Sequence, residues 1–223
     1  MKKKLWILMG IILIGAGGCM RELAWQIFES NKIKYEWNIV GYVDKCDDSA
    51  VSSVKVAGIE IPYLGDDGYL LNSPIDVNVI MSVGNPHFRK KLVEKYRANS
   101  HIKFPNLILQ NTKVCADVEM GQGCIISMDS KISTNVKLGN FVFINMDSTI
   151  CHDGELGDYV SVNPAVKLAG AVNVGNETEI GLGANVIQGI TVGHDVVIGA
   201  GSVIIRDTED SCTLVGVPGR KVR

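Results

Sequence analysis

A large hydrophobic residue recurs every six positions from Ile102 to Ile204, and this period restricts the chain to very few folds. All eighteen members of the series are Ile, Leu, Val or Met, and no insertion breaks the register. If such residues fill about a third of all positions, chance produces a run of this kind on the order of once in a hundred million. The members are Ile102, Ile108, Val114, Met120, Ile126, Ile132, Leu138, Ile144, Ile150, Leu156, Val162, Leu168, Val174, Ile180, Val186, Val192, Ile198 and Ile204.

A period of six fits neither an amphipathic helix nor the simple alternation of a strand. It is typical of a solenoid of short strands joined by tight corners, in which three six-residue repeats make one coil. We therefore expect a parallel β-helix whose apolar side chains point inward and stack in columns. An ordinary β-sandwich is disfavoured, because its hairpin turns would fall at irregular spacing. Glycine often follows the repeated residue, as expected at tight corners, at Gly121, Gly139, Gly157, Gly175, Gly181, Gly193 and Gly199.

The first 100 residues follow another pattern, that of a small α/β domain with a parallel sheet. The predicted elements are strands over residues 5–14, 38–43 and 76–83, helices over 21–30, 66–71 and 87–99, a strand pair over 54–62 and a loop over 45–53. We place the domain junction near residues 100–105. The predicted fold is thus a Rossmann-like α/β domain, residues 1–100, followed by a parallel β-helix of hexapeptide repeats, residues 101–223.

The N-terminus has two interpretations. Lys2 to Lys4 and the apolar residues 5–14 look like a signal peptide, and the stretch before Cys19 resembles a lipoprotein cleavage site. We favour a first buried strand, because an amphipathic helix and a second strand follow it. The chain has six cysteines without CxxC spacing, which favours reduced thiols and a cytoplasmic protein. Apart from this segment no apolar run is long enough to span a bilayer, so we expect no stable membrane insertion.

A glycine-rich turn after the first strand is a candidate nucleotide site, because a helix N-terminus at this place offers free N–H groups to phosphates. Gly17 and Gly18 lie in the turn, although it lacks the full GxGxxG spacing and its glycines also simply permit a tight turn. Asp44 closes the second strand, where a carboxylate can meet a ribose hydroxyl, and Gly84 follows another strand. A nucleic acid is disfavoured as a partner, since the formal net charge is -2 and the pI is near 6.1.

Two histidines, His152 and His194, lie well inside the repeat. They are 42 residues apart, or two coils plus six, so they fall on different faces and cannot meet within one chain. One coil beyond His152 is Gly170, where a missing side chain leaves room for a ligand and exposes a backbone N–H beside the imidazole. Asp153 follows the histidine, and an acidic neighbour makes an imidazole a stronger base. This imidazole is suited to accept a proton near neutral pH.

Six short motifs run through both halves of the chain. They are Gly-Ala-Gly-Gly at 15–18, Gly-Tyr-Val-Asp at 41–44, Val-Gly-Asn-Pro at 83–86, His-Asp at 152–153, Val-Ser-Val-Asn-Pro at 160–164 and Val-Gly-Val-Pro-Gly-Arg at 215–220. Together they resemble the family of sialic acid O-acetyltransferases and UDP-4-amino-sugar N-acetyltransferases of bacterial surface-glycan biosynthesis, and the similarity covers nearly the whole chain. The resemblance implies a left-handed β-helix, a homotrimer, and acetyl-CoA as co-substrate without a metal.

The resemblance also implies roles for single residues. His152 is the general base, Asp153 strengthens it, and Gly170 offers its amide to the acetyl oxygen. The implied acetyl-CoA contacts are Ser161, Gly170, Leu182 and Ala200, with the tail at residues 217–221 near the CoA nucleotide. The implied sugar-nucleotide contacts are Gly17, Gly18, Cys19, Asp44, Lys45 and Gly84. Two positions depart from the family: Ser161 replaces a second histidine, and the turn reads Gly18-Cys19-Met20 instead of Gly-His-Gly. The acetyl contact and the nucleotide therefore stay open.

We predict an acetyl-CoA-dependent acyltransferase that N-acetylates a nucleotide-activated amino sugar, with UDP as the nucleotide, by direct transfer. One alternative is O-acetylation of sialic acid or another sugar hydroxyl, and another is a non-catalytic nucleotide-sugar-binding protein. A metal-dependent hydratase resembling the γ-type carbonic anhydrases is disfavoured, because it needs three converging histidines. His87 and His101, outside the inner repeat, are expected to be structural or solvated.

Overall fold

The computed structural model describes residues 9–45 and 52–222. The start of the predicted first strand, Lys2 to Lys4 and Cys46 lie outside the described residues. The chain divides into two compact units, residues 1–83 with 91–105 and residues 84–90 with 106–223. We call them the α/β unit and the β-helix unit and describe each by itself. The predicted fold class is confirmed: an N-terminal α/β region precedes a left-handed parallel β-helix.

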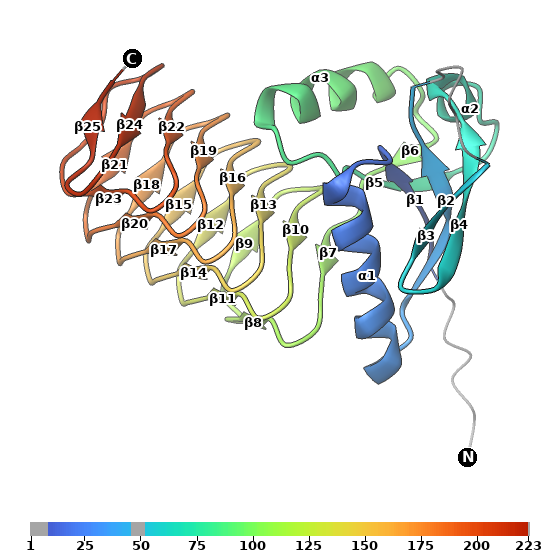
Figure 1. Cartoon of the computed structure of the whole chain (residues 1–223), viewed down its shortest axis with the longest axis horizontal. Coiled ribbons are helices and arrows are strands. Elements are labelled where there is room, and N and C mark those ends of the chain that lie inside the picture. The colour runs from blue at the N-terminus through green and yellow to red at the C-terminus, as the bar shows by residue number, and fades with distance from the viewer. Residues whose placement is uncertain (1–8, 46–51, 223) are drawn as a thin grey trace. The chain divides into compact units, whose positions relative to one another are not determined.

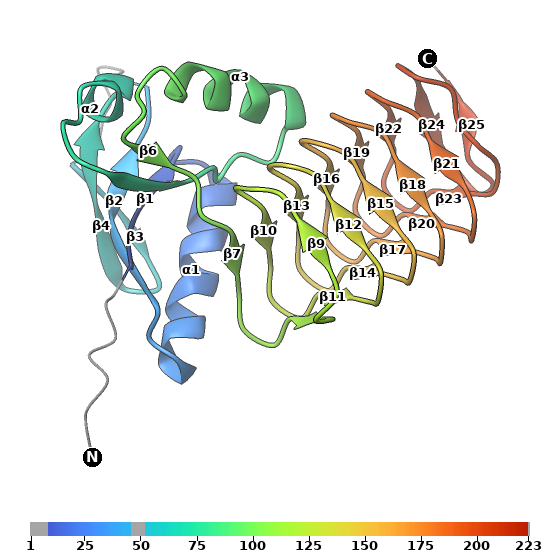
Figure 2. The ribbon, with the colours of Figure 1, turned by 180° about the vertical axis from the view of Figure 1, so that it is seen from behind.

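The α/β unit contains a six-stranded sheet in the order β3-β4-β2-β1-β5-β6 (Figure 1). Neighbouring strands are parallel except for the β3–β4 hairpin, which is the predicted strand pair. Figure 2 shows the same sheet from behind. Its strands are β1 (Met9–Ile14), β2 (Trp37–Val43), β3 (Ser53–Val56), β4 (Ile59–Gly65), β5 (Val77–Ile80) and β6 (Ile102–Lys103).

The described residues form three helices, α1 (Gly18–Ile33), α2 (Asp67–Leu71) and α3 (Pro86–Tyr96). Helix α1 is longer at both ends than the predicted 21–30, because it begins directly at the glycine turn. It buries Leu23, Ala24 and Ile27, which recur at helical spacing. Among the helices of the described residues, none is both long and apolar enough to cross a lipid bilayer.

The first two members of the six-residue series, Ile102 and Ile108, are not part of the stacked core as predicted. Ile102 lies in β6, which pairs with β5 in the sheet of the α/β unit, so this residue is not part of the solenoid. Ile108 remains 41% exposed. Ile108 belongs to β7 (Leu107–Ile108) in the first coil, so no earlier coil covers it. The inward column becomes continuous only from Val114 onward.

The β-helix unit has three faces, made of two-residue strands that pair in parallel except at the C-terminal hairpin of the first face. The first face contains β7 (Leu107–Ile108), β10 (Ile125–Ile126), β13 (Phe143–Ile144), β16 (Ser161–Val162), β19 (Glu179–Ile180), β22 (Val197–Ile198), and the end hairpin β24 (Thr213–Val215) and β25 (Arg220–Lys221). The second contains β8 (Lys113–Val114), β11 (Lys131–Ile132), β14 (Thr149–Ile150), β17 (Lys167–Leu168), β20 (Asn185–Val186) and β23 (Val203–Ile204). The third contains β9 (Glu119–Met120), β12 (Lys137–Leu138), β15 (Glu155–Leu156), β18 (Asn173–Val174) and β21 (Thr191–Val192).

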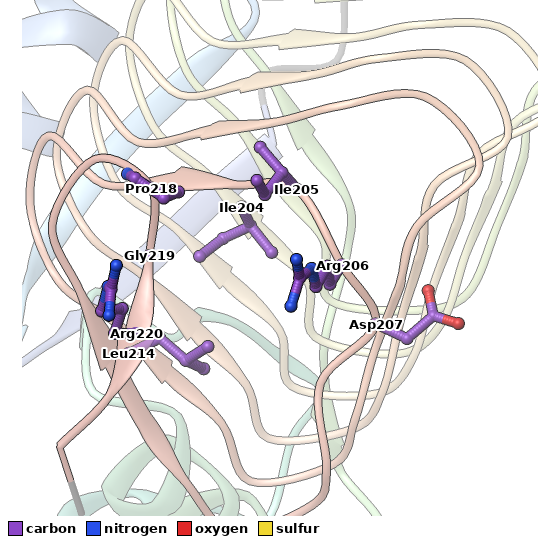
Figure 3. Close-up of a pocket in the computed structure, with 8 residues that line it drawn as sticks. All are labelled: Ile204, Ile205, Arg206, Asp207, Leu214, Pro218, Gly219 and Arg220. Atoms are coloured by element: carbon purple, nitrogen blue, oxygen red, sulfur yellow. The ribbon is translucent and has the colours of Figure 1, made fainter.

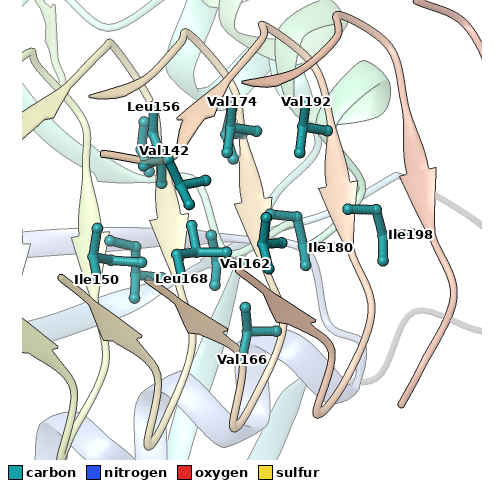
Figure 4. Packing of buried hydrophobic residues seen from close by; sticks show 14 of the residues in the cluster. Val142, Ile150, Leu156, Val162, Val166, Leu168, Val174, Ile180, Val192 and Ile198 are labelled. Atoms are coloured by element: carbon teal, nitrogen blue, oxygen red, sulfur yellow. The ribbon is translucent and has the colours of Figure 1, made fainter. Parts of the chain in front are cut away.

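Residues eighteen apart lie side by side on neighbouring coils, as Ile126 does with Ile144 and Ile144 with Val162. The inward side chains therefore stack in columns and form one continuous core. Figure 4 shows two such rows: Leu156, Val174 and Val192 in one, and Val162, Ile180 and Ile198 in the other. Each buried side chain of this size contributes about 1.5–3 kcal/mol of transfer free energy.

Most of the corners contain a residue in the left-handed backbone region. It recurs every six residues, and from Gly123 to Gly201 no corner lacks it. Glycine adopts this conformation freely, but here it is often Asn, Asp or Ala, at a cost of about 1–2 kcal/mol each. The repeated corner conformation turns the chain by the same angle every time. We name the corners by the faces that they join: first (first to second face), second (second to third) and third (third to first).

Polar side chains form a ladder along the third corner. In each step a side chain accepts a hydrogen bond from the backbone N–H of the corner one coil earlier. His194 belongs to this ladder, since its Nδ1 accepts from Asn176 N at 3.0 Å. It therefore has a structural role. The ladder comprises Gln122, Asn140, Asp158, Asn176, His194 and Asp210.

Residues 84–90 lie against this third corner and belong to the β-helix unit. Arg89 is only 1% exposed, and its guanidinium donates to the carbonyl oxygens of Phe141 at 3.1 Å and Tyr159 at 2.8 Å. The two aromatic rings stack with centroids 5.3 Å apart. The buried cation thus satisfies the carbonyls of two successive corners and holds the segment in place.

Candidate active site

The candidate base, His152, lies at the second corner, between β14 and β15. Asp153 is the left-handed residue of this corner, with φ 58°. The corner turns the Asp153 carboxylate back toward its neighbour, so that Asp153 Oδ2 lies 2.7 Å from His152 Nδ1. Both side chains stand on the surface, 52% and 51% exposed. The structure therefore brings these two predicted residues together on a convex edge of the β-helix.

The Asp153 carboxylate has a second partner that sequence reasoning missed. Asn135, one coil earlier at the same corner, donates from Nδ2 to Asp153 Oδ1 at 2.6 Å. This hydrogen bond, and next the one from His152, hold the pKa of Asp153 below its usual value. An ionised carboxylate only accepts hydrogen bonds, so His152 Nδ1 carries the hydrogen, and in the neutral imidazole Nε2 then carries the lone pair. Subtracting one coil from 153 would have found Asn135.

Gly170 lies directly against the imidazole. A Cβ atom built at Gly170 would be 2.4 Å from His152 Cε1 and 2.6 Å from Nε2. The sequence predicted that the missing side chain leaves room for a ligand; instead, the imidazole itself fills the space. Among the described residues no acceptor lies against the Gly170 N–H, while its carbonyl accepts from Gly189 N at 2.9 Å. An N–H donor beside a base is what an acyl-transfer site needs.

The predicted acetyl-CoA residues occupy different places. Ser161 on β16 is 3% exposed, and its hydroxyl donates to Gly84 O at 2.6 Å and accepts from Arg89 Nη2 at 2.9 Å. The hydroxyl is therefore engaged inside the protein in this structure. Leu182 and Ala200 lie on successive coils of the first corner, with Leu182 57% exposed. Within one chain, then, the structure does not bring Leu182 and Ala200 to His152.

A cavity of about 360 Å³ lies at the C-terminal end of the β-helix (Figure 3). Arg206 and Arg220 supply two guanidinium groups, and Ile204 and Leu214 supply apolar surface. Pro218 and Gly219 of the predicted tail line the same cavity. Arg206 lies at the second corner three coils beyond His152, or about 14 Å along the axis at the usual strand spacing. The cavity has the composition expected for a phosphate-bearing group with an apolar portion.

The glycine turn of the α/β unit ends at the N-terminus of α1. Gly17 is the N-cap, without a side-chain hydrogen bond, and no acidic residue lies in the first turn. A Cβ atom at Gly17 or Gly18 would meet no atom within 4 Å, and neither residue has a left-handed φ. Neither packing nor backbone geometry therefore requires glycine here. The bare helix end remains open to an anion.

Asp44 holds this turn in place. Its Oδ2 accepts from Ala16 N at 2.8 Å, and its Oδ1 accepts from Lys45 N at 2.7 Å. Both carboxylate oxygens are thus engaged with backbone N–H groups, which the ribose-binding prediction did not foresee. Cys19 lies half-buried in the first turn of α1 and Lys45 is exposed. Gly84, in the β-helix unit, has open space at its Cα and accepts at its carbonyl from Arg89 and Ser161.

The remaining histidines have acidic partners. His101 Nδ1 is 2.9 Å from Asp76 Oδ1, and His87 lies between Glu177 and Asp195. In the described ranges, no cluster of three or more His, Cys, Asp or Glu residues could hold a metal ion.

This chain is similar to several known proteins. The model of the PglD N-terminal domain matches residues 10–96. PerB from Caulobacter crescentus, solved with CoA and GDP-perosamine, is 32% identical over 95% of this chain and 96% of its own, with a TM-score of 0.81. The acetyltransferase domain of PglB from Neisseria gonorrhoeae FA1090, solved with acetyl coenzyme A, is 29% identical over 96% and 100%, with a TM-score of 0.83. WeeI from Acinetobacter baumannii AYE is 26% identical over 96% and 100%, with a TM-score of 0.75. The comparison with curated proteins found no match.

Proposed function

Because this chain belongs to the family of hexapeptide-repeat sugar N-acetyltransferases, we propose that it transfers the acetyl group of acetyl-CoA to the amine of a nucleotide-activated amino sugar. The observation that carries the proposal is the His152–Asp153 pair beside the Gly170 N–H. A lone pair on Nε2 and a nearby N–H donor are the two groups that direct acyl transfer requires.

In the proposed reaction, His152 is the general base. As the sugar amine attacks the thioester carbonyl, His152 Nε2 takes the proton that the nitrogen loses. The Gly170 N–H stabilises the negative oxygen of the tetrahedral intermediate, an interaction worth about 10²–10³ in rate. The carbon–sulfur bond then breaks, and the imidazolium returns its proton to the CoA thiolate. The products are an acetamido sugar and CoA, without an acyl-enzyme.

The acetyl donor is proposed to lie lengthwise along the second corner, from His152 toward Arg206. Arg206 and Arg220 suit the phosphates of CoA. Leu182 and Ala200 lie on another corner of the same chain, so a groove lined by them and by His152 requires a second copy. This supports a homotrimer with one groove at each of three interfaces.

The acceptor is assigned to the α/β unit, and so residues 1–100 are proposed as the acceptor domain and 101–223 as the acetyl-CoA domain. The bare N-terminus of α1 suits a diphosphate, and Gly17 and Gly18 let it approach closely. We propose UDP as the nucleotide, which the sequence resemblance implies, whereas PerB was solved with GDP-perosamine. The cytoplasm is the proposed compartment, supported by the cysteines of the described residues, which form no disulfide with one another.

The test is a transfer assay with labelled acetyl-CoA against UDP- and GDP-linked 4-amino sugars and against sugar hydroxyl acceptors. We expect an alkali-stable amide on an amino sugar, faster with the UDP-linked acceptor. An alkali-labile ester would favour the O-acetyltransferase alternative, and nucleotide-sugar binding without any transfer would favour a binding protein.

His152→Ala is expected to lower kcat about 10²- to 10⁴-fold, because the amine then loses its proton only to solvent. Size-exclusion chromatography and the melting temperature should be unchanged, since the side chain is exposed. Near-normal turnover would remove His152 as the base.

A further inference from the structure

Asn135 is the one side chain other than His152 that reaches the Asp153 carboxylate with a hydrogen-bond donor in the described part of the chain. We propose that Asn135 is a positioning residue, whose side-chain amide fixes the Asp153 carboxylate so that it faces His152 Nδ1 and leaves Nε2 unprotonated. The inference rests on the proposed role of His152 as general base.

The geometry divides the carboxylate between two donors. Asp153 Oδ1 is 2.6 Å from Asn135 Nδ2, and Oδ2 is 2.7 Å from His152 Nδ1. Each oxygen has one partner, and the partners come from different coils. Because Asp153 is half exposed, water competes for its oxygens and the side chain would otherwise sample several rotamers. The amide of Asn135 selects the rotamer that meets the imidazole.

In the described residues, the Asp153 carboxylate accepts from side chains alone and takes no part in closing the backbone of the corner. In the ladder of the third corner, side chains accept from backbone N–H groups and so complete the corners; Asn140 Nδ2 also donates to Asp158 Oδ1 at 3.1 Å, but that oxygen accepts from the backbone N–H of Asn140 as well. The Asn135–Asp153 bond joins two side chains. The backbone N–H of Asp153 is already satisfied by Thr134 O at 3.1 Å, whatever the side chain does. The contact therefore orients the Asp153 side chain, and the backbone of the corner is hydrogen-bonded without it.

The series of polar side chains at the second corner is also interrupted for two coils just after the candidate base. The residues that follow Asn135 and Asp153 at one-coil spacing are Ala171 and Gly189. Neither carries a polar side chain, and beside them Gly170 receives the imidazole. Polar support thus reaches His152 from the N-terminal side alone, while Gly170 offers only backbone on the other side.

The test replaces Asn135 by Ala in the full-length protein. Alanine suits this corner, since Ala165 and Ala171 adopt the same left-handed conformation at equivalent corner positions. Asn111→Ala is the matched control: Asn111 is also a left-handed corner asparagine, with φ 59°, but lies at the first corner on the first coil. Asn135→Asp is a second variant that keeps the size and lacks the donor.

We expect Asn135→Ala and Asn135→Asp to lower kcat about 10- to 100-fold, with the KM values for both substrates and the melting temperature close to wild type. Asn111→Ala should retain wild-type kcat. In ¹⁵N-histidine spectra above the titration of imidazole, His152 should change from the Nδ1–H tautomer toward the Nε2–H tautomer. The signal is assigned by its absence in His152→Ala.

Two results would overturn the inference. One is a normal kcat in both Asn135 variants while His152→Ala is inactive, which leaves the proposed function standing. The other is a reduced kcat with the Nδ1–H tautomer unchanged, since the loss would then not pass through the imidazole. If His152→Ala itself is active, the proposed function fails first.

Discussion

His152 and Gly170 touch because one coil of the β-helix brings position i against position i+18. The imidazole lies where any larger residue at 170 would place its Cβ atom. Glycine at position 170 thus lets the imidazole ring pack against the next coil beside a backbone N–H. In a regular solenoid, the absence of one side chain positions the side chain of the neighbouring coil.

Gly170→Ala should therefore remove activity without unfolding the protein. The backbone at this position is not left-handed, so alanine is tolerated, but its Cβ atom must displace the ring of His152. We expect kcat to fall about 10²- to 10³-fold, with the free energy of unfolding changed by less than about 1 kcal/mol. Combining it with His152→Ala should cost no more than His152→Ala alone. Additive losses would show that the alanine acts by another route.

Counting eighteen residues, or one coil, along the sequence predicted the contact between His152 and Gly170. The same count backward from Asp153 leads to Asn135. It could not predict the surroundings of Ser161 or Asp44. The Ser161 hydroxyl is engaged by Arg89, which is 72 residues away and enters from outside the repeat. Asp44 reaches a backbone N–H in a turn 28 residues earlier. Such contacts depend on how separate segments pack, and no period in the sequence records them.

At the scale of secondary structure, helix α1 begins in an unusual way for a helix of its length. Its N-cap is Gly17, its next residue is Gly18, and it has no capping side chain or first-turn acid. Sequence patterns placed its start at residue 21, because apolar periodicity begins there and capping signals are absent. Stability alone would favour Ser, Thr, Asp or Asn at the cap. The missing cap is understandable if a ligand anion supplies the acceptor.

Gly17→Asp should thus change stability and substrate binding in opposite directions. The backbone at Gly17, φ -73° and ψ -173°, suits an aspartate cap, which should raise the free energy of unfolding by about 0.3–1 kcal/mol. The same carboxylate would repel a diphosphate, so KM for the nucleotide sugar should rise at least about tenfold. KM for acetyl-CoA should not change. Gly17→Ser is the control, since it caps without charge and should affect KM less. An unchanged KM in the Gly17→Asp variant would show that the diphosphate binds elsewhere.

At the scale of the whole molecule, the repeat fixes where residues lie around the β-helix axis. Sequence spacing alone separated His152 and His194, and the structure accounts for His194 by its place in the third-corner ladder. The same geometry puts the candidate base and Gly170 on the second corner, and Leu182 and Ala200 on the first. One chain therefore carries both halves of the proposed groove, but on edges that face away from each other. The six-residue period predicts a start of the β-helix that is too early, because Ile102 pairs with the sheet of the α/β unit.

If the groove is shared between copies, two inactive variants should restore each other. His152→Ala removes the base, and Leu182→Asp places a charge on the exposed apolar edge without disturbing the core. In randomly mixed trimers at equal proportions, about a quarter of the interfaces would pair an intact His152 with an intact Leu182 from the neighbour, because each is present in half of the subunits. Co-refolding should thus recover about a quarter of wild-type activity, while each variant refolded alone stays inactive. A double variant mixed with wild type serves as the control for subunit exchange. If the mixture of single variants gains no activity although exchange occurs, the site must be complete within one chain, and the two corners would not form a common groove.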